Sequence, residues 1–183
     1  MCHTKYPTAT DIAEMRARGY TVKTISEAES LLPRTLMRDD LITRIRTAFH
    51  GVSLGNGVGL VEGQALDDYD DAETCAAIRA RDEKEDWTKF GPQLLRECQS
   101  SLSFCDAEGM RFHLPAFLIQ GLLEEIDPPI FDLTYKPGEN AERFSLLSPE
   151  QRAIVRDYLR FIIDDPDEDD EDLRAAIEGC WSE

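Results

Sequence analysis

The sequence predicts a mainly α protein, a single compact helical domain with an N-terminal arm and at most one short strand or hairpin. Apolar residues recur at helical spacing along the 183 residues, most clearly at Ile154, Val155, Tyr158, Leu159, Ile162 and Ile163. This length corresponds to one domain, and no apolar run has the ~20 residues that cross a bilayer. Because the composition changes near Pro33, we expect an arm over residues 1–35 and an acidic helical domain over residues 36–183.

Capping signals divide the N-terminal segment into short helices. Thr10 begins a predicted helix, and Gly19 is suited to end it. Ser26 and Glu29 have the spacing of a capping box, in which each side chain bonds the backbone N–H of the other. We expect Pro33 to end the helix that follows, because proline lacks an N–H and disrupts a helix interior.

The middle of the chain alternates between loops and helices. Apolar spacing predicts a helix over Leu41–Phe49, and the glycine-rich stretch Gly51–Gly59 is expected to be a flexible loop. That loop lacks the Lys-Ser/Thr of a phosphate-binding loop, so no nucleotide site is predicted. Further helices are expected over Asp71–Lys84 and after Pro92, and Asp106 is placed to cap another helical turn.

The C-terminal third contains one predicted strand among helices. Pro115 is expected to start a helix, since proline is tolerated in the first helical turn. Ile130–Tyr135 is predicted to be a strand. Ser148 and Gln151 form a second capping box before the amphipathic helix, and a last helix is expected from about Asp170 to Gly179.

The charge is uneven and restricts the classes of partner. The net charge is −17, and residues 1–50 hold 8 Lys and Arg against 6 Asp and Glu, so the excess of acid lies in residues 51–183. Such a chain repels nucleic acid and anionic membranes and attracts basic proteins. We therefore expect a basic protein partner, no nucleic acid and no membrane. A homodimer that uses the helix at residues 154–163 is an alternative.

The cysteines indicate a cytoplasmic protein. Five cysteines are scattered along the chain, as Cys2, Cys75, Cys98, Cys105 and Cys180, without the close pairs that hold zinc. Reduced cysteines that pack as small apolar side chains are typical of that compartment. The N-terminus also lacks the apolar stretch of a secretory signal. The sequence predicts no metal site and no cofactor.

Two acidic segments form the predicted partner-binding surface. The candidate residues are Asp67, Asp68, Asp82, Glu83, Glu85, Asp86, Asp167, Glu168, Asp169 and Asp170. A basic protein would be steered to such a surface, whereas adjacent carboxylates on a helix point away from one another and do not converge on a metal ion. The leading hypothesis is a small acidic binding module, of the immunity-protein or antitoxin type, that neutralises a basic toxin or enzyme.

No complete catalytic motif is present. Cys105, Glu108 and His113 have side chains suited to a nucleophile and a base, but their spacing does not imply contact between thiol and imidazole. Packing and capping roles are favoured, so no catalytic residue is predicted. The enzyme alternative places a site around His113 and Glu108, together with the carboxylates Asp67, Asp68 and Asp82.

The middle of the chain resembles a bacterial domain family of unknown function. The resemblance rests on the blocks Glu62–Tyr69, Thr74–Ala77 and Asp82–Trp87, and on an aromatic-x-Leu-Pro-Ala element within Phe112–Phe117. It covers roughly residues 40–165, which follow the predicted arm. Members of that family are similar to this chain in being small, acidic and helical. The resemblance implies no activity, cofactor or site.

Overall fold

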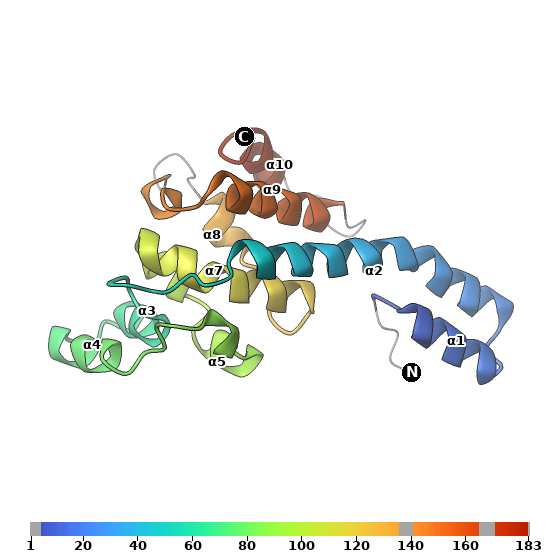
Figure 1. The fold of residues 1–183 in the computed structure, drawn as a ribbon, viewed down its shortest axis with the longest axis horizontal. Coiled ribbons are helices and arrows are strands. Elements are labelled where there is room, and N and C mark those ends of the chain that lie inside the picture. Colours follow the sequence, from blue (N-terminus) through green and yellow to red (C-terminus); the bar gives the residue numbers. More distant parts are fainter. Residues whose placement is uncertain (1–4, 136–140, 165–170, 183) are drawn as a thin grey trace. The chain divides into compact units, whose positions relative to one another are not determined.

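The computed structural model describes residues 5–135, 141–164 and 171–182, and every regular element in these ranges is helical (Figure 1). The predicted mainly α fold class is thereby confirmed. The chain divides into two compact units, residues 1–43 and residues 44–183. In the described ranges, no helix has the length and apolar character needed to cross a membrane.

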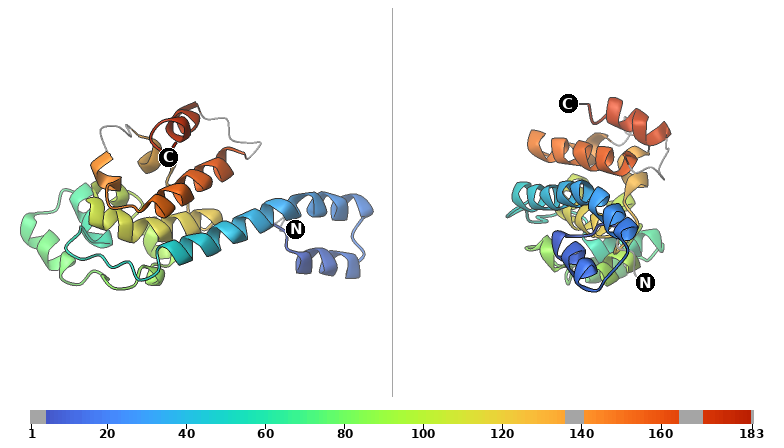
Figure 2. Two further views of the ribbon diagram at one scale, coloured as in Figure 1. Left: turned by 45° about the horizontal axis from the view of Figure 1, so that its top comes forward. Right: turned by 90° about the vertical axis from the view of Figure 1, so that its right-hand side faces the viewer.

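The N-terminal unit consists of α1 (Ala9–Ala17) and the larger part of α2 (Val22–Ala48), which lie side by side (Figures 1 and 2). Gly19 follows α1 at φ +74°, a left-handed conformation that glycine adopts without strain, and so ends the helix as predicted. The buried Thr35 hydroxyl of α2 donates to the Pro7 carbonyl at 2.9 Å. This bond fixes the segment before α1 against α2.

Two predictions for this unit are wrong, because α2 is one continuous helix. Pro33 lies inside α2 instead of ending a helix, and Ser26 lies in its interior instead of at a cap. An interior proline costs a helix about 3 kcal/mol. Packed positions on both sides of the proline, Ala28 and Thr35, are buried and hold the helix together across it.

The C-terminal unit contains several short helices and two longer ones. After α2 follow α3 (Leu60–Asp67), α4 (Ala72–Arg79), η1 (Trp87–Lys89), α5 (Pro92–Glu97) and α6 (Ser101–Phe104). The rest of the unit comprises α7 (Ala107–Leu122), α8 (Ile130–Thr134), η2 (Ala141–Phe144), α9 (Pro149–Ile163) and α10 (Glu171–Glu178). α3 contacts both α4 and α6, whereas α10 contacts α8 and α9.

α7 is the central helix of this unit. Twelve of its 16 residues are buried, so it is enclosed on nearly all sides. It begins at Asp106, whose carboxylate accepts the Gly109 amide at 2.8 Å, as predicted for a cap. Pro115 lies inside α7, and the prediction that it starts a helix is wrong. The surrounding core stabilises the turn that the proline weakens.

The predicted strand at Ile130–Tyr135 is also wrong, because this segment forms α8. The Thr134 hydroxyl donates to the Ile130 carbonyl one turn earlier, at 2.9 Å. Leu133 is buried while Phe131 is 61% exposed, so the segment buries one face of a helical turn. An apolar run of this length fits a strand or a helix equally well, and the packing of the unit decides between them.

The capping box at the start of α9 is confirmed. The Ser148 hydroxyl accepts the Gln151 amide at 3.1 Å, and the Gln151 side chain accepts the Ser148 amide at 3.0 Å. The Gln151 side-chain amide also donates to the Ala48 carbonyl at 2.9 Å. The cap therefore attaches the first turn of α9 to the last turn of α2.

Trp181 anchors the end of the chain in the C-terminal unit. Its side chain is 1% exposed, and its indole Nε1 donates to the Leu133 carbonyl of α8 at 2.9 Å. The ring packs edge-on against Phe144, with 4.9 Å between centroids, and the Arg152 guanidinium lies 5.1 Å from its centroid. One side chain thus connects α8, η2 and α9.

We expect Trp181→Ala to lower the free energy of unfolding by about 3–5 kcal/mol, because it creates a large cavity and leaves a buried carbonyl unbonded. Urea denaturation monitored by circular dichroism measures the change. Phe131→Ala, which removes an aromatic ring from a largely exposed position, serves as the control and is expected to change the free energy by less than about 1 kcal/mol. Equal unfolding midpoints for the two variants would contradict the anchoring role.

Candidate functional site

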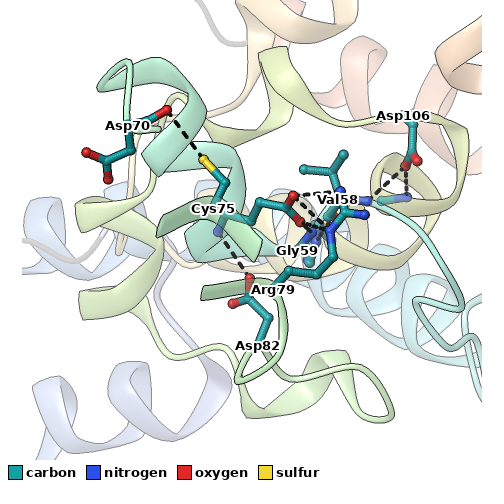
Figure 3. A network of polar contacts seen from close by, with 10 residues as sticks. Val58, Gly59, Asp70, Cys75, Arg79, Asp82 and Asp106 are labelled. Atoms are coloured by element: carbon teal, nitrogen blue, oxygen red, sulfur yellow. Dashed lines mark hydrogen bonds and ion pairs between the residues drawn. The ribbon is translucent and has the colours of Figure 1, made fainter. Parts of the chain in front are cut away.

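A polar cluster surrounds the N-terminus of α3 (Figure 3). The Glu62 carboxylate is buried and accepts Arg79 Nε at 2.8 and 2.7 Å and an Arg79 terminal nitrogen at 2.6 Å. It also accepts the Gly59 amide at 3.1 Å. Because Arg79 belongs to α4, this ion pair fastens α4 to α3, and its removal would leave a buried carboxylate without a counter-charge.

Asp82 caps the same helix from outside. Its two carboxylate oxygens accept the amides of Val61 at 3.2 Å and Glu62 at 3.1 Å. Burial raises the pKa of Asp82, and the nearby Glu62 charge acts in the same direction, against the two backbone hydrogen bonds. Two neighbouring carboxylates thus lie at the N-terminus of α3, where a helix dipole favours negative charge.

The glycine-rich loop before α3 is fixed by hydrogen bonds on both sides of its backbone. The Val58 amide donates to Asp106 at 3.2 Å, and the Val58 carbonyl accepts from the His113 ring at 3.0 Å. The Gly59 amide is engaged by Glu62. Two amides that a phosphate cradle would need are thus bound to carboxylates of the chain itself.

The loop backbone lies so close to neighbouring groups that only glycine fits at some of its positions. A Cβ on Gly59 would lie 2.1 Å from an Asp82 carboxylate oxygen, and one on Gly57 would lie 2.6 Å from the Gly109 amide nitrogen. A Cβ on Gly109 would in turn lie 2.6 Å from the Val58 carbonyl oxygen. The glycines allow the loop backbone to lie directly against Asp82 and the first turn of α7.

His113 is fully buried between aromatic rings. Its ring centroid lies 5.3 Å from that of Phe90 and 5.1 Å from that of Phe112. A carbonyl can only accept, so the hydrogen bond to Val58 places the proton on Nε2. Burial lowers the pKa of His113 to about 4, which keeps the imidazole neutral at pH 7.

The other members of the Cys105–Glu108–His113 set are not linked to the imidazole. In the described part of the chain, no hydrogen bond joins any two of these three side chains. Cys105 is buried, and burial together with the Asp106 charge raises the pKa of its thiol, opposite to the shift that a nucleophilic thiolate needs. Glu108 is half-buried in the first turn of α7.

The predicted acidic surface at residues 82–86 is largely occupied by contacts within the chain. Glu83 accepts the amides of Glu85 at 3.0 Å and Asp86 at 3.1 Å. The Lys89 ammonium, 2.7 Å away, is the main reason that the pKa of Glu83 is lowered to about 2. The Asp86 carboxylate accepts the amide and the hydroxyl of Thr88. Of this group, Glu85 is exposed.

The other acidic candidates lie at the end of α3 or outside the described residues. Asp67 and Asp68 accept the Gln64 side-chain amide at 3.5 and 3.3 Å, in the last turn and C-cap of α3. Asp167, Glu168, Asp169 and Asp170 lie outside the described residues. Within residues 5–135, 141–164 and 171–182, no group of three or more His, Cys, Asp or Glu side chains is arranged to hold a metal ion.

Sequence reasoning missed the Glu62–Arg79 pair. The position of Glu62 was predictable from a capping pattern. It is the third residue of α3 after the N-cap Gly59, where a Glu side chain commonly accepts the cap amide. No such pattern marks Arg79, which lies 17 residues further along the chain. Its pairing depends on how α4 folds back on α3.

We expect Gly59→Ala to destabilise the protein by about 1–3 kcal/mol, because the new methyl group displaces Asp82 from the α3 amides. Gly91→Ala is a matched control. Both glycines are helix N-caps with ordinary negative φ, and a Cβ on Gly91 meets nothing within 4 Å. Chemical denaturation compares the two variants, and equal losses of stability would contradict the close-approach argument.

We expect stability to fall as the pH decreases from about 6.5 to about 4 in a way that depends on His113. The unfolded imidazole takes up a proton in this range while the folded one does not, so the contribution lost is about 3 kcal/mol at most. His113→Gln retains a donor for Val58 but does not titrate. Urea denaturation at about pH 7 and about pH 4.5 should show a smaller decrease for His113→Gln than for the unmodified protein. Equal decreases would contradict the assignment.

The comparisons with known proteins identify a family but no activity. No curated protein and no solved structure matches the chain. A family of unknown function, DUF6714, matches residues 37–183, which include the polar cluster, the acidic segments and the Phe112–Phe117 element. The resemblance seen over roughly residues 40–165 is thereby confirmed. The chain belongs to DUF6714, a family of unknown function.

Proposed function

We propose that the protein is a cytoplasmic binding module whose acidic surface neutralises a basic protein partner, as an inhibitor of the bacterial immunity-protein or antitoxin kind. The observation that carries this proposal is the composition of the α3–α4 connection. Residues 67–73 contain five Asp and Glu and no Lys or Arg, and Asp68, Asp70 and Asp71 are exposed. A basic surface would find uncompensated negative charge there.

The surroundings of the catalytic candidates support a binding role over an enzymatic one. His113 is neutral and enclosed by Phe90 and Phe112, and its Nε2 is bonded to a backbone carbonyl. General acid–base catalysis needs a proton-transfer group that meets a substrate at a pKa near the working pH. Cys105 is buried with a raised pKa, so its thiol is protonated at neutral pH.

The packing of α9 favours a different partner over a homodimer formed through that helix. The apolar stripe on which the homodimer alternative rests is buried within the C-terminal unit. Its core positions are each at most 1% exposed, at Ile154, Val155, Tyr158 and Leu159. A stripe that already fills the core is not available to a second copy.

The test is co-expression with the protein encoded next to it, followed by binding measurements from about 50 to about 300 mM NaCl. We expect a complex whose affinity and association rate fall as the salt concentration rises. Neutralising Asp67, Asp68 and Asp70 to Asn should slow association several-fold. Failure of the neighbouring protein to bind at any salt concentration would overturn the proposal.

A charge-matched control separates local from overall charge. Asp127, Glu150 and Glu178 are exposed and lie on other segments of the C-terminal unit. Neutralising these three to the corresponding amides changes the net charge by the same amount and should leave the association rate closer to that of the unmodified protein. Equal effects of the two triple variants would show that the net charge, and not the α3–α4 segment, steers the partner.

A further inference from the structure

We infer that the turn between α3 and α4 is the docking site for the basic partner, with Tyr69 as its central contact and arginine or lysine side chains of the partner around the tyrosine ring. This inference rests on the proposed function and assigns it a place on the surface. Tyr69 is almost fully exposed to solvent. The side chain is 95% exposed, the highest value for any large apolar side chain in the described ranges.

Tyr69 stands at a backbone position that normally belongs to glycine. Its φ is +61°, and its amide donates to the Leu66 carbonyl at 3.3 Å while the Asp70 amide donates to the Ala65 carbonyl at 3.0 Å. These two bonds are those of a Schellman motif, with Tyr69 as the left-handed residue after the C-cap. A side chain in this conformation is strained relative to the right-handed one, and glycine avoids that strain.

The tyrosine ring is in solvent, so it makes no packing contact that could offset this backbone strain. A strained residue with no packing role is a reason to look for a functional one. The turn is also held at both ends. Asp68 caps the end of α3, and Asp71 caps the start of α4 by accepting the Thr74 amide at 2.8 Å. An aromatic side chain on a fixed turn loses little conformational entropy on binding.

The surroundings of Tyr69 define the chemistry of the partner. Other partly exposed apolar side chains lie on α3, where Val61 is 37% and Leu66 36% exposed. Acidic residues flank the tyrosine on both sides of the sequence, at Asp67, Asp68, Asp70 and Asp71. Tyrosine and arginine are among the residues enriched at the energetic centres of protein interfaces. A guanidinium is attracted both to an aromatic face and to carboxylates. The turn therefore suits a basic protein surface rich in arginine.

The decisive variant is Tyr69→Gly, for which stability and binding change in opposite directions. Glycine relieves the strain at φ +61°, so the urea midpoint should rise, and the net charge is unchanged. Binding to the protein encoded next to it should weaken at least tenfold, because a central aromatic contact is lost. Undiminished binding of Tyr69→Gly to that protein would overturn the inference while leaving the proposed function intact.

Glu124→Gly is the matched control for the backbone effect. Glu124 follows α7 at φ +59°, with its amide bonded to the Gly121 carbonyl at 3.1 Å and the Glu125 amide bonded to the Gln120 carbonyl at 3.0 Å. It thus has the same motif as Tyr69 without the aromatic side chain. Because glycine relieves the same backbone strain, we expect this variant to keep its affinity apart from the small effect of removing one negative charge. An equal loss of affinity in both variants would count against a specific role for Tyr69.

A second probe does not depend on the neighbouring protein. The isotope-labelled full chain is titrated with a synthetic arginine-rich peptide, and backbone amide shifts are followed by NMR. We expect the largest shifts within residues 61–73 and their loss in Tyr69→Gly. Shifts centred on other acidic segments, or unaffected by the substitution, would overturn the docking site. If the peptide maps to the turn but the neighbouring protein does not bind, the site stands and the proposed inhibitor function fails.

Discussion

The close approach of the glycine loop to Asp82 and to the first turn of α7 is the constraint on which the C-terminal unit depends. The loop backbone lies so near these groups that side chains are excluded at Gly57, Gly59 and Gly109. This proximity allows Val58 to bond Asp106 and His113 at once, and it places Asp82 on the α3 amides. The start of α3, the start of α7 and the buried histidine are thus positioned by one segment of backbone.

The same constraint divides the acidic residues into two groups. Glu62, Asp82 and Asp106 act as helix caps or ion-pair partners inside the unit. Others, at the α3–α4 turn, are exposed to solvent. Overall acidity alone therefore overstates the surface available to a partner, since part of the negative charge is used to build the fold. At the turn, four exposed carboxylates at Asp68, Asp70, Asp71 and Glu73 lie within five residues of Tyr69 in the sequence.

The sequence was informative where a signal is local. The Ser148 capping box, the Asp106 cap and the glycine stop at Gly19 depend on residues within one helical turn, and each is found in the structure. The predictions that Pro33 ends a helix and Pro115 starts one were wrong, because tertiary packing keeps α2 and α7 helical on both sides of each proline. The strand predicted at residues 130–135 failed because a short apolar run does not specify its partner surface. The Glu62–Arg79 pair and the exposure of Tyr69 depend on the fold of α3 against α4, which no local pattern encodes.

The tryptophan fluorescence of the chain comes entirely from the C-terminal unit, because both tryptophans lie there. Trp87 and Trp181 are both buried in the C-terminal unit, and each indole N–H is bonded to a distant backbone carbonyl, of Phe49 and Leu133 respectively. Residues 1–43 contain no tryptophan, although α1 and most of α2 contribute helical ellipticity. Melting of the N-terminal unit alone would therefore lower the ellipticity while leaving tryptophan emission nearly constant, so these two spectroscopic signals separate the units without any added label.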